Sequence, residues 1–195
     1  RRVLFRSELG HKLSKEEYAT IEPQLRTDLL NTQFDLLEHK DFAAVILING
    51  IDGAGRGETV NLLNEWMDPR HIEVHAFDQP TDEERQRPRL WRFWRALPAK
   101  GKIGILFGNW YSEPINERSF KRMKKAHLDQ RLSELNRFEA MFAAEGVLLI
   151  KFWFHLSQAG QKKRLKALEA NPDTRWRVRE ADWEIYEHYD RYREV

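Results

Sequence analysis

The stretch NGIDGAGRGETVNLLNEW, residues 49–66, holds the residues whose types and spacing are best suited to chemistry. Its glycines allow backbone N–H groups to turn inward around the oxygens of a phosphate. A helix that begins directly after the glycines adds favourable partial positive charge at its N-terminus. The stretch therefore predicts a phosphate-binding loop, or P-loop. A tight strand-to-helix turn without a ligand is the alternative.

Two charged side chains within this loop are candidates for catalysis. Asp52 offers carboxylate oxygens that suit Mg²⁺, although capping the following helix would also explain it. Arg56 stands where such loops carry lysine, and Gly57 stands where they carry serine or threonine. Arginine keeps the charge, but it is planar and bulkier, so it does not reproduce the point contact of lysine on phosphate.

A second group of cations follows the loop in the sequence. Five arginines crowd the segment from Arg85 to Arg95 and could neutralise neighbouring units of a polyanion. The alternative is a solvated helix face in which these arginines pair with the acids at residues 82–84. The candidate phosphate-binding residues are Gly50, Asp52, Gly53, Ala54, Gly55, Arg56, Gly57, Glu58, Arg92 and Arg95.

The elements that must position these residues alternate along the chain. Strands are predicted at Ala43–Asn49, Ile72–Phe77, Lys102–Phe107 and Val147–Leu156. Helices are predicted at Leu13–His39, from the loop to about Met67, at Asp82–Leu97, over most of Ile115–Glu145, from Ser157 to about Ala170, and at Glu180–Arg193. The first strand is continuously apolar, which is typical of a strand buried on both faces. The alternation predicts an α/β sandwich around a mainly parallel sheet.

Local signals mark some boundaries of these elements. Ser14 and Glu17 form an S-x-x-E pattern, which predicts a capping box at the start of the first helix. Pro88 indicates a break or a second helix start within residues 82–97. Gly146 is expected to end the long helix before the fourth strand.

Composition limits the class of protein. The chain has 195 residues, of which 41% are hydrophobic, and this suits one packed domain. Charged residues make up 33% but the net charge is only +2, which argues against a dedicated nucleic-acid binder. Without cysteine there is neither a disulfide nor a thiolate metal site. Because no apolar run approaches about 20 residues and no signal peptide is visible, we expect a cytoplasmic protein without a membrane span.

Both ends of the sequence look unlike those of a natural domain. RRVLFRS, residues 1–7, resembles the translation of a short-read sequencing adapter, so we expect it to be non-native. A genuine basic arm is the alternative. The last residues, HYDRYREV, stop within a predicted helix. We therefore expect residues 8–195 to form one domain that is incomplete at its C-terminus.

Several long segments resemble the polyphosphate kinase 2 family. INGIDGAGRGETVNLLNEWMDPR is similar to its Walker A segment, and LWRFWRALPAKGKIGILFGNWY to the segment that leads through the second catalytic strand into the lid. KFWFHLSQAGQKKRL and RWRVREADWEIYEHYD resemble its C-terminal signature. The resemblance covers nearly all of residues 8–195. It implies a P-loop kinase-like three-layer sandwich with a helical lid.

The same resemblance implies an activity and partners. The family moves phosphoryl groups between inorganic polyphosphate and nucleotides such as AMP and ADP, uses Mg²⁺ and tends to form oligomers. GETVNLLNEWMDPR, FDQPTDEE and FGNWYSEPI are most similar to the N-terminal half of two-domain polyphosphate:AMP phosphotransferases. In that subgroup two family domains are fused, and the C-terminal copy carries the intact site. The family's usual final strand has no counterpart in this sequence.

Departures from the family pattern bear on catalysis. Active copies carry lysine where this chain has Arg56, and an aspartate-arginine pair where it has Phe107 and Gly108. Phe107 cannot ligate Mg²⁺, and Gly108 offers no side chain to a phosphate. We therefore expect a catalytically degenerate domain that supports an active copy and helps to guide polyphosphate. The alternatives are an active kinase with a reduced site of Asp52 and Arg56, a module that binds ATP or polyphosphate without turnover, and an unrelated P-loop regulator.

Overall fold

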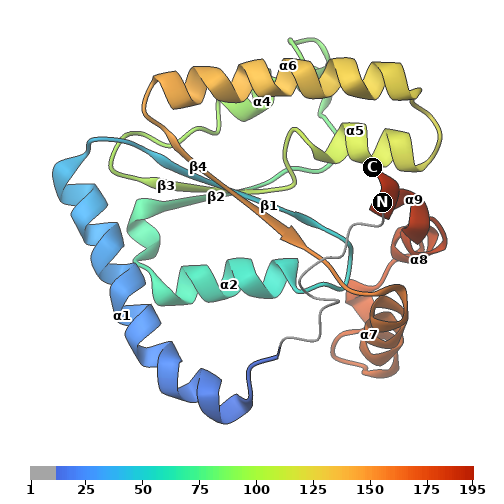
Figure 1. Cartoon of the computed structure of the whole chain (residues 1–195), viewed down its shortest axis with the longest axis horizontal. Coiled ribbons are helices and arrows are strands. Elements are labelled where there is room, and N and C mark those ends of the chain that lie inside the picture. Colours follow the sequence, from blue (N-terminus) through green and yellow to red (C-terminus); the bar gives the residue numbers. More distant parts are fainter. Residues whose placement is uncertain (1–11) are drawn as a thin grey trace.

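The computed structural model describes residues 12–195 as an α/β fold of three layers (Figure 1). Its sheet contains the four strands β1 (Ala44–Gly50), β2 (Ile72–Ala76), β3 (Ile103–Phe107) and β4 (Leu148–Phe154). They are parallel and lie in the order β2-β3-β1-β4. The predicted fold class and the four predicted strands are thus confirmed. The adapter-like segment at residues 1–7 lies outside the described residues.

Helices cover both faces of the sheet and the carboxyl ends of its strands. They are α1 (Lys15–His39), α2 (Arg56–Trp66), α3 (Asp82–Arg85), α4 (Trp91–Trp94), α5 (Ser112–Ser119), α6 (Lys125–Ala144), α7 (Gln158–Ala170), α8 (Glu180–Glu187) and α9 (Tyr189–Glu194), with 3₁₀ turns η2 (Pro69–His71) and η3 (Arg175–Arg177). Helices α1 and α2 lie on one face, and α4 and α6 lie on the other (Figure 1). No helix within residues 12–195 is long and apolar enough to cross a membrane.

The two halves of the core follow from the alternation of side chains along β1. Val45 and Leu47 pack towards α4 and α6, whereas Ile46 and Ile48 pack towards α1 and α2. Burying one such aliphatic side chain contributes roughly 1.5–3 kcal/mol. Since both faces of β1 are buried, this strand is a rigid support for the loop that follows it.

Helix boundaries agree with some local signals and correct others. Ser14 and Glu17 form the predicted capping box, and Pro88 separates two short helices, α3 and α4. The long helix predicted over residues 115–145 is instead two helices, because residues 120–124 leave the helical path and Lys121 adopts a positive φ of 58°. The last predicted helix is likewise divided at His188.

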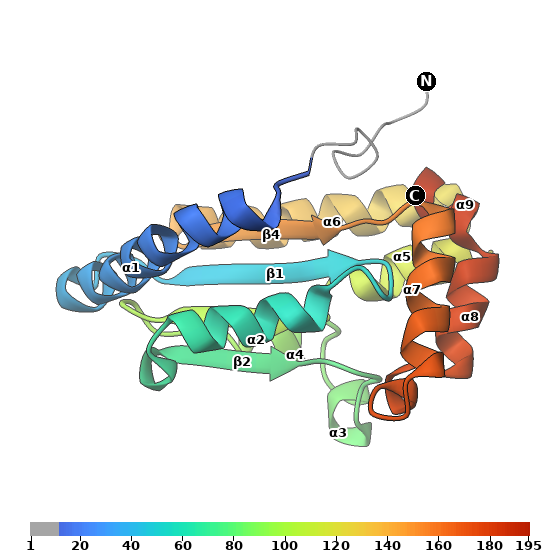
Figure 2. The same cartoon turned by 90° about the horizontal axis from the view of Figure 1, so that it is seen from below.

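The carboxyl ends of the strands are the part of the fold that forms a site. Figure 2 shows α7, α8 and α9 standing across this end of the sheet, beside α5. In parallel α/β sheets, ligands bind in crevices at this end.

Candidate functional site

The glycine-rich loop connects the central strand β1 to the N-terminus of α2. Gly50, Gly53 and Gly55 have φ values of 136°, 80° and 96°, which side chains rarely tolerate. Gly55 occupies the N-cap of α2, and no side chain caps this helix. The first N–H groups of α2 therefore remain available to an anion, as the sequence predicts.

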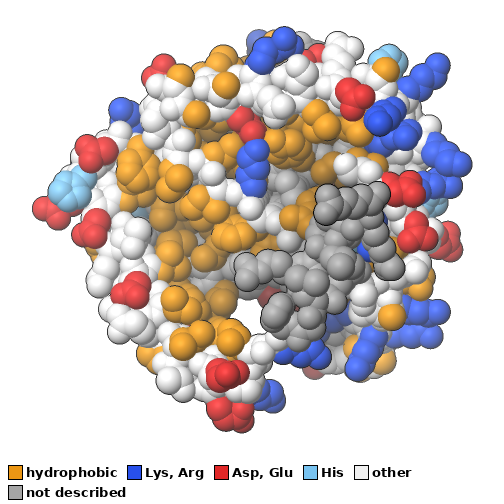
Figure 3. All heavy atoms as spheres, viewed as in Figure 1, with side chains coloured by type: hydrophobic (Ala, Val, Ile, Leu, Met, Phe, Trp, Pro, Cys, Tyr) orange, Lys and Arg blue, Asp and Glu red, His pale blue; other side chains and the backbone are white. Residues whose placement is uncertain are grey.

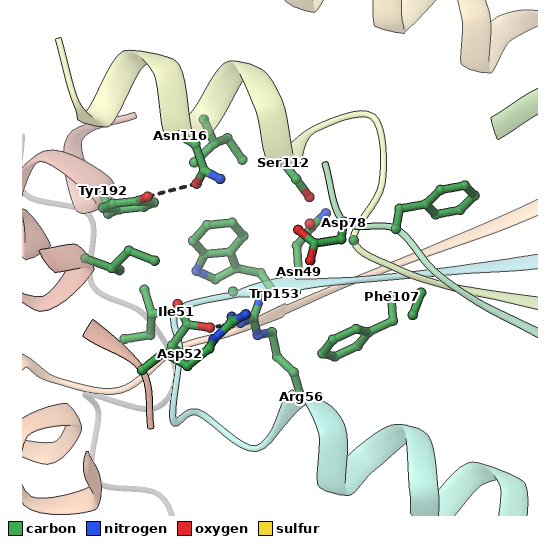
Figure 4. Close-up of a pocket in the computed structure, with 17 residues that line it drawn as sticks. Asn49, Ile51, Asp52, Arg56, Asp78, Phe107, Ser112, Asn116, Trp153 and Tyr192 are labelled. Atoms are coloured by element: carbon green, nitrogen blue, oxygen red, sulfur yellow. Dashed lines mark hydrogen bonds and ion pairs between the residues drawn. The ribbon is translucent and has the colours of Figure 1, made fainter. Parts of the chain in front are cut away.

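A cavity of about 360 Å³ opens beside this loop (Figure 4). Its walls come from the carboxyl ends of β1, β2 and β3, from α5 and from the C-terminal helices. Asn49, Asp52, Arg56, Asp78, Phe107, Ser112, Asn116, Trp153, Arg179 and Tyr192 are among the residues that line it. The loop is therefore not a closed turn, and there is room for an anion beside it.

Asp52 and Arg56 form an ion pair across the loop. The two residues are four positions apart, and Figure 4 shows the guanidinium directed at the carboxylate. Burial raises the pKa of the Asp52 carboxyl, and the charge of Arg56 partly offsets this effect.

The end of β3 supplies an aromatic ring to this pair. The Arg56 guanidinium carbon lies 5.5 Å from the centroid of the Phe107 ring. The next residue, Gly108, has φ 73°, and a Cβ atom there would approach the carbonyl oxygen of Phe77 to 2.5 Å. Any side chain at position 108 would be strained in this backbone. The aspartate-arginine pair of active copies thus has no equivalent in this part of the cavity.

The donor set does not fit the Mg²⁺ that the family resemblance implies. Mg²⁺ prefers a shell of oxygens that includes carboxylates. Asp52 is already paired with Arg56, Phe107 presents an aromatic ring at the end of β3, and Asp78 is the one other carboxylate among the residues that line the cavity. Within residues 12–195, no group of three or more histidines or acids is placed to hold a metal ion. Asp52 therefore loses its support as a metal ligand, and the structure favours its role as a partner of Arg56.

Three basic residues near the loop are not among the sequence candidates. Glu58, in the first turn of α2, pairs with Arg164 at 3.1 Å and with Arg177 at 2.7 Å. Arg179 lines the cavity directly. They come from α7, η3 and the start of α8, more than 100 residues along the chain. The run RWRVR at residues 175–179 is the only local signal that could have pointed to two of them.

The same contacts define the part that Glu58 plays. Although burial raises the pKa of its carboxyl, backbone hydrogen bonding and Arg177 lower it overall. A carboxylate held between two arginines would repel a phosphate. Glu58 can therefore help to bind an anion only through its backbone N–H, and it positions the two arginines.

A second cavity, of about 640 Å³, adjoins the first. Phe77, Asp78, Ser112, Asn116, Ile185 and Tyr192 line both cavities. Arg85, Arg89, Arg92 and Arg122 line the larger one. Three of the five arginines in the predicted cluster thus line a cavity, and Arg122 joins them from the segment after α5. The alternative, pairing with the acids at residues 82–84, is also observed, because Arg85, Arg87 and Arg92 lie 2.7, 3.9 and 3.3 Å from Asp82, Glu83 and Glu84.

The two arginines predicted to bind phosphate differ in position. Arg92 lines the larger cavity, lies 3.3 Å from Glu84 and donates to the Asp78 carbonyl oxygen at 3.0 Å. Arg95 lines neither cavity, and its guanidinium lies 4.7 Å from the Trp91 ring centroid. The structure therefore brings Arg92 towards the site and leaves Arg95 outside it.

Three buried donors in the larger cavity have no hydrogen-bond partner among the described residues. They are Nδ2 of Asn109, Nη1 of Arg89 and Nε of Arg92, the last of which lies 3.3 Å from Glu84 in an ion pair. Asn109 is only 3% exposed, and its carbonyl oxygen accepts from Asn49 at 3.1 Å. Buried donors without partners are rare in folded proteins. They indicate that an acceptor-rich ligand suits this cavity.

Comparison with known proteins identifies the family. The pattern described as Polyphosphate kinase 2 (PPK2) matches residues 12–195. The chain belongs to this family. It is 53% identical over 186 residues to the polyphosphate:AMP phosphotransferase of Pseudomonas aeruginosa, which covers 95% of the chain and 38% of that relative. A polyphosphate:AMP phosphotransferase of Acinetobacter johnsonii is 33% identical over 158 residues, which cover 81% of the chain and 33% of the relative.

Solved structures of the PPK2 family share the fold. A crystal structure of polyphosphate kinase 2 from Arthrobacter aurescens TC1 matches with a TM-score of 0.88 at 26% identity, covering 95% of this chain and 67% of that one. A structure from Pseudomonas aeruginosa PA01 matches with a TM-score of 0.82 at 49% identity, covering 95% and 37%. The P-loop kinase-like architecture is thus confirmed. The chain spans less than two fifths of the length of the polyphosphate:AMP phosphotransferases described above.

Proposed function

We propose that this chain is a catalytically degenerate PPK2 domain that binds polyphosphate and supports an active copy of the same family. The parent protein would transfer phosphate between polyphosphate and AMP or ADP. The active copy would be a second family domain in the same protein, and the assembly would be oligomeric. The relatives named polyphosphate:AMP phosphotransferase, which extend well beyond the matched region, support this proposal.

The observation that carries the proposal is the contact of Arg56 with both Asp52 and Phe107. Phosphoryl transfer depends on cations and metal ions that neutralise charge on the transferred group. Here the only loop carboxylate is paired with the loop cation, and an apolar ring occupies the end of β3. The anion-binding backbone of the loop is kept, but the groups that would drive transfer are not.

An active kinase with a reduced site is the second candidate. The retained P-loop geometry and the two adjoining cavities favour it, because together they offer room for a donor and an acceptor. The proposal and this candidate differ in turnover and not in binding. An assay of phosphotransfer by the chain therefore separates the degenerate domain from the active kinase.

Polyphosphate binding should depend on the arginines at the rim of the larger cavity. Arg85 and Arg122 are exposed and pair with the acids Asp82 and Glu117, whereas Arg92 is largely buried and held by Glu84 and the Asp78 carbonyl. We expect Arg85→Ala with Arg122→Ala to weaken binding by about 10-fold and to reduce the slope of log affinity against log salt by about 1 per arginine. Titration of a labelled polyphosphate at several salt concentrations measures both.

Arg70→Ala is the matched control for this experiment. Arg70 is an exposed arginine paired with Asp68, and it precedes β2, at the opposite end of the sheet from the cavities. Its loss changes the net charge by the same amount per residue. An equal loss of affinity in this variant, or an unchanged salt slope in the double variant, would contradict a binding role for the cavity arginines.

The exposed edge of β4 gives the proposed partner a place to bind. Among the described residues, β4 pairs only with β1. Leu148, Phe152 and Trp153 on this strand are 47%, 43% and 38% exposed. Hydrophobic side chains gather across the middle of the face shown in Figure 3, where β4 crosses in Figure 1. We propose that a further strand of the parent protein covers this edge.

The chain alone is therefore expected to self-associate through β4. Unpaired edge strands template association, and lysine on an edge opposes it. We expect Leu148→Lys with Phe152→Lys to shift the chain towards monomer in size-exclusion chromatography with light scattering. Val74→Lys is the control, because Val74 lies on the other edge strand, β2, and its side chain is 42% exposed. A shift towards monomer produced only by Val74→Lys would show that the chain associates through β2 and would contradict the proposal.

A further inference from the structure

We propose that the P-loop of this chain holds phosphate without a divalent cation, because the guanidinium of Arg56 takes the place of the metal. This inference rests on the proposed binding of polyphosphate. It concerns which positive charge accompanies the anion in the smaller cavity. The poor fit of the site to Mg²⁺, described above, is its starting point.

The Asp52 carboxylate is already occupied by an ion pair with Arg56. Asp52 is the one carboxylate within the loop, and its side chain is 19% exposed. Its bond from Arg56 satisfies the negative charge that would otherwise attract a metal ion. A metal at this carboxylate would have to displace a guanidinium that its own neighbours hold in place.

The end of β3 suits the guanidinium of Arg56 better than it suits a metal ion. The Phe107 ring lies beside the guanidinium, with 5.5 Å between the guanidinium carbon and the ring centroid. Such contacts favour arginine, which is planar and weakly hydrated, over a hydrated metal ion. Gly108 keeps a positive φ and packs against the Phe77 carbonyl, which leaves no space for a ligating side chain.

Several N–H donors beside the loop remain free to bind an anion. A guanidinium has five N–H donors in a rigid fork, and Asp52 occupies only part of this fork. Arg179 also lines the cavity, and the N–H groups of α2 begin at Arg56. These groups suit phosphate oxygens directly and need no bridging ion.

A reversed dependence on Mg²⁺ follows. In a metal-dependent site Mg²⁺ joins the phosphate to protein carboxylates and strengthens binding. Here Mg²⁺ would have to displace Arg56 to reach Asp52, whereas in solution it associates freely with polyphosphate and competes with the arginines for it. We therefore expect Mg²⁺ to weaken binding of polyphosphate to this chain.

The test is titration of a labelled polyphosphate of fixed length into the full chain, in EDTA and in excess Mg²⁺ at matched ionic strength. We expect the dissociation constant in Mg²⁺ to be about 3-fold or more above that in EDTA, in keeping with the salt sensitivity of phosphate-backbone binding. A dissociation constant in Mg²⁺ that is equal to or below the one in EDTA would overturn the inference. Absence of binding under both conditions would overturn the proposed function itself.

Asp52→Asn provides a second and independent readout. If Asp52 only neutralises Arg56, its neutral isostere frees the guanidinium, and binding becomes tighter in EDTA. If Asp52 is a metal ligand, the same change weakens binding in Mg²⁺ and leaves binding in EDTA unaffected. Asp68→Asn, in the Asp68–Arg70 pair at the far end of the sheet, is the matched control. Calorimetric titration of Mn²⁺ into the free chain should show no site that Asp52→Asn removes.

Discussion

The isolated chain is expected to transfer phosphate between polyphosphate and AMP or ADP at least about 10³-fold more slowly than an intact PPK2 enzyme. A single transition-state cation is worth about that factor in related phosphoryl transfer. This chain lacks both the carboxylate and the cation at the end of β3, where Phe107 and Gly108 stand. Coupled measurement of ADP or ATP formation with polyphosphate and Mg²⁺ tests the expectation. Turnover comparable to that of an intact family member would establish the alternative of an active kinase with a reduced site.

Introducing the lysine, aspartate and arginine of the family pattern at positions 56, 107 and 108 is not expected to be enough to make the chain active. Arg56→Lys changes one loop cation into another, and Phe107→Asp introduces a carboxylate at the end of β3. The backbone at both positions has ordinary negative φ values and accepts any side chain. Gly108→Arg is different, because the new side chain meets the Phe77 carbonyl at a positive φ. We expect the triple variant to be less stable than the double variant, and thermal unfolding of both is therefore the control for their activities. Under the proposed function, the expected loss of activity would therefore lie in the backbone at Gly108 as well as in the side chains.

Much of the fold could be predicted from the sequence because its signals are local. Buried β1 follows from a continuous apolar run, and the start of α1 follows from Ser14 and Glu17. The Asp52–Arg56 contact is also local, since the two residues lie four positions apart at the start of a helix. In each case neighbouring residues alone determine the structure.

The rest of the site depends on segments that meet only in the folded chain. Arg164 and Arg177 reach Glu58 from more than 100 residues away, and nothing in their own sequence context specifies this contact. The same holds for Arg92, whose burial against Glu84 and the Asp78 carbonyl separates it from Arg95. Composition shows a cluster of arginines, but only the path of the chain decides which of them face a cavity.

Three departures from the family pattern make physical sense together. Arg56 in place of lysine can lie beside an aromatic ring and still bind Asp52, as it does here with Phe107. Phe107 in place of aspartate removes a charge that would compete for the same guanidinium. Gly108 in place of arginine lets β3 turn sharply against Phe77. This agreement supports a site adapted to binding rather than one that has decayed at random.

Gly50→Ala is expected to destabilise the fold by about 3 kcal/mol or more, which corresponds to a fall in Tm on the order of 10 °C for a chain of this size. Gly50 has φ 136°, and a Cβ atom there would lie 2.1 Å from the carbonyl oxygen and 2.6 Å from the nitrogen of Phe154. Both atoms belong to backbone at the end of β4, so no side chain can rotate away to relieve the overlap. The strand register at Gly50 and Phe154 would have to open. Thermal and denaturant unfolding measure the loss.

Gly57→Ala makes the same chemical change only seven residues along the chain and should have the opposite sign. Gly57 lies in the first turn of α2, and a Cβ atom there meets nothing within 4 Å. Alanine is the better helix former by up to about 1 kcal/mol, so the free energy of unfolding should rise by an amount of that order. If both variants lost stability equally, the loop would be generally intolerant of side chains. If only Gly50→Ala does so, the close approach of β1 and β4 is what fixes the start of the loop, and with it the position of every N–H group that faces the anion.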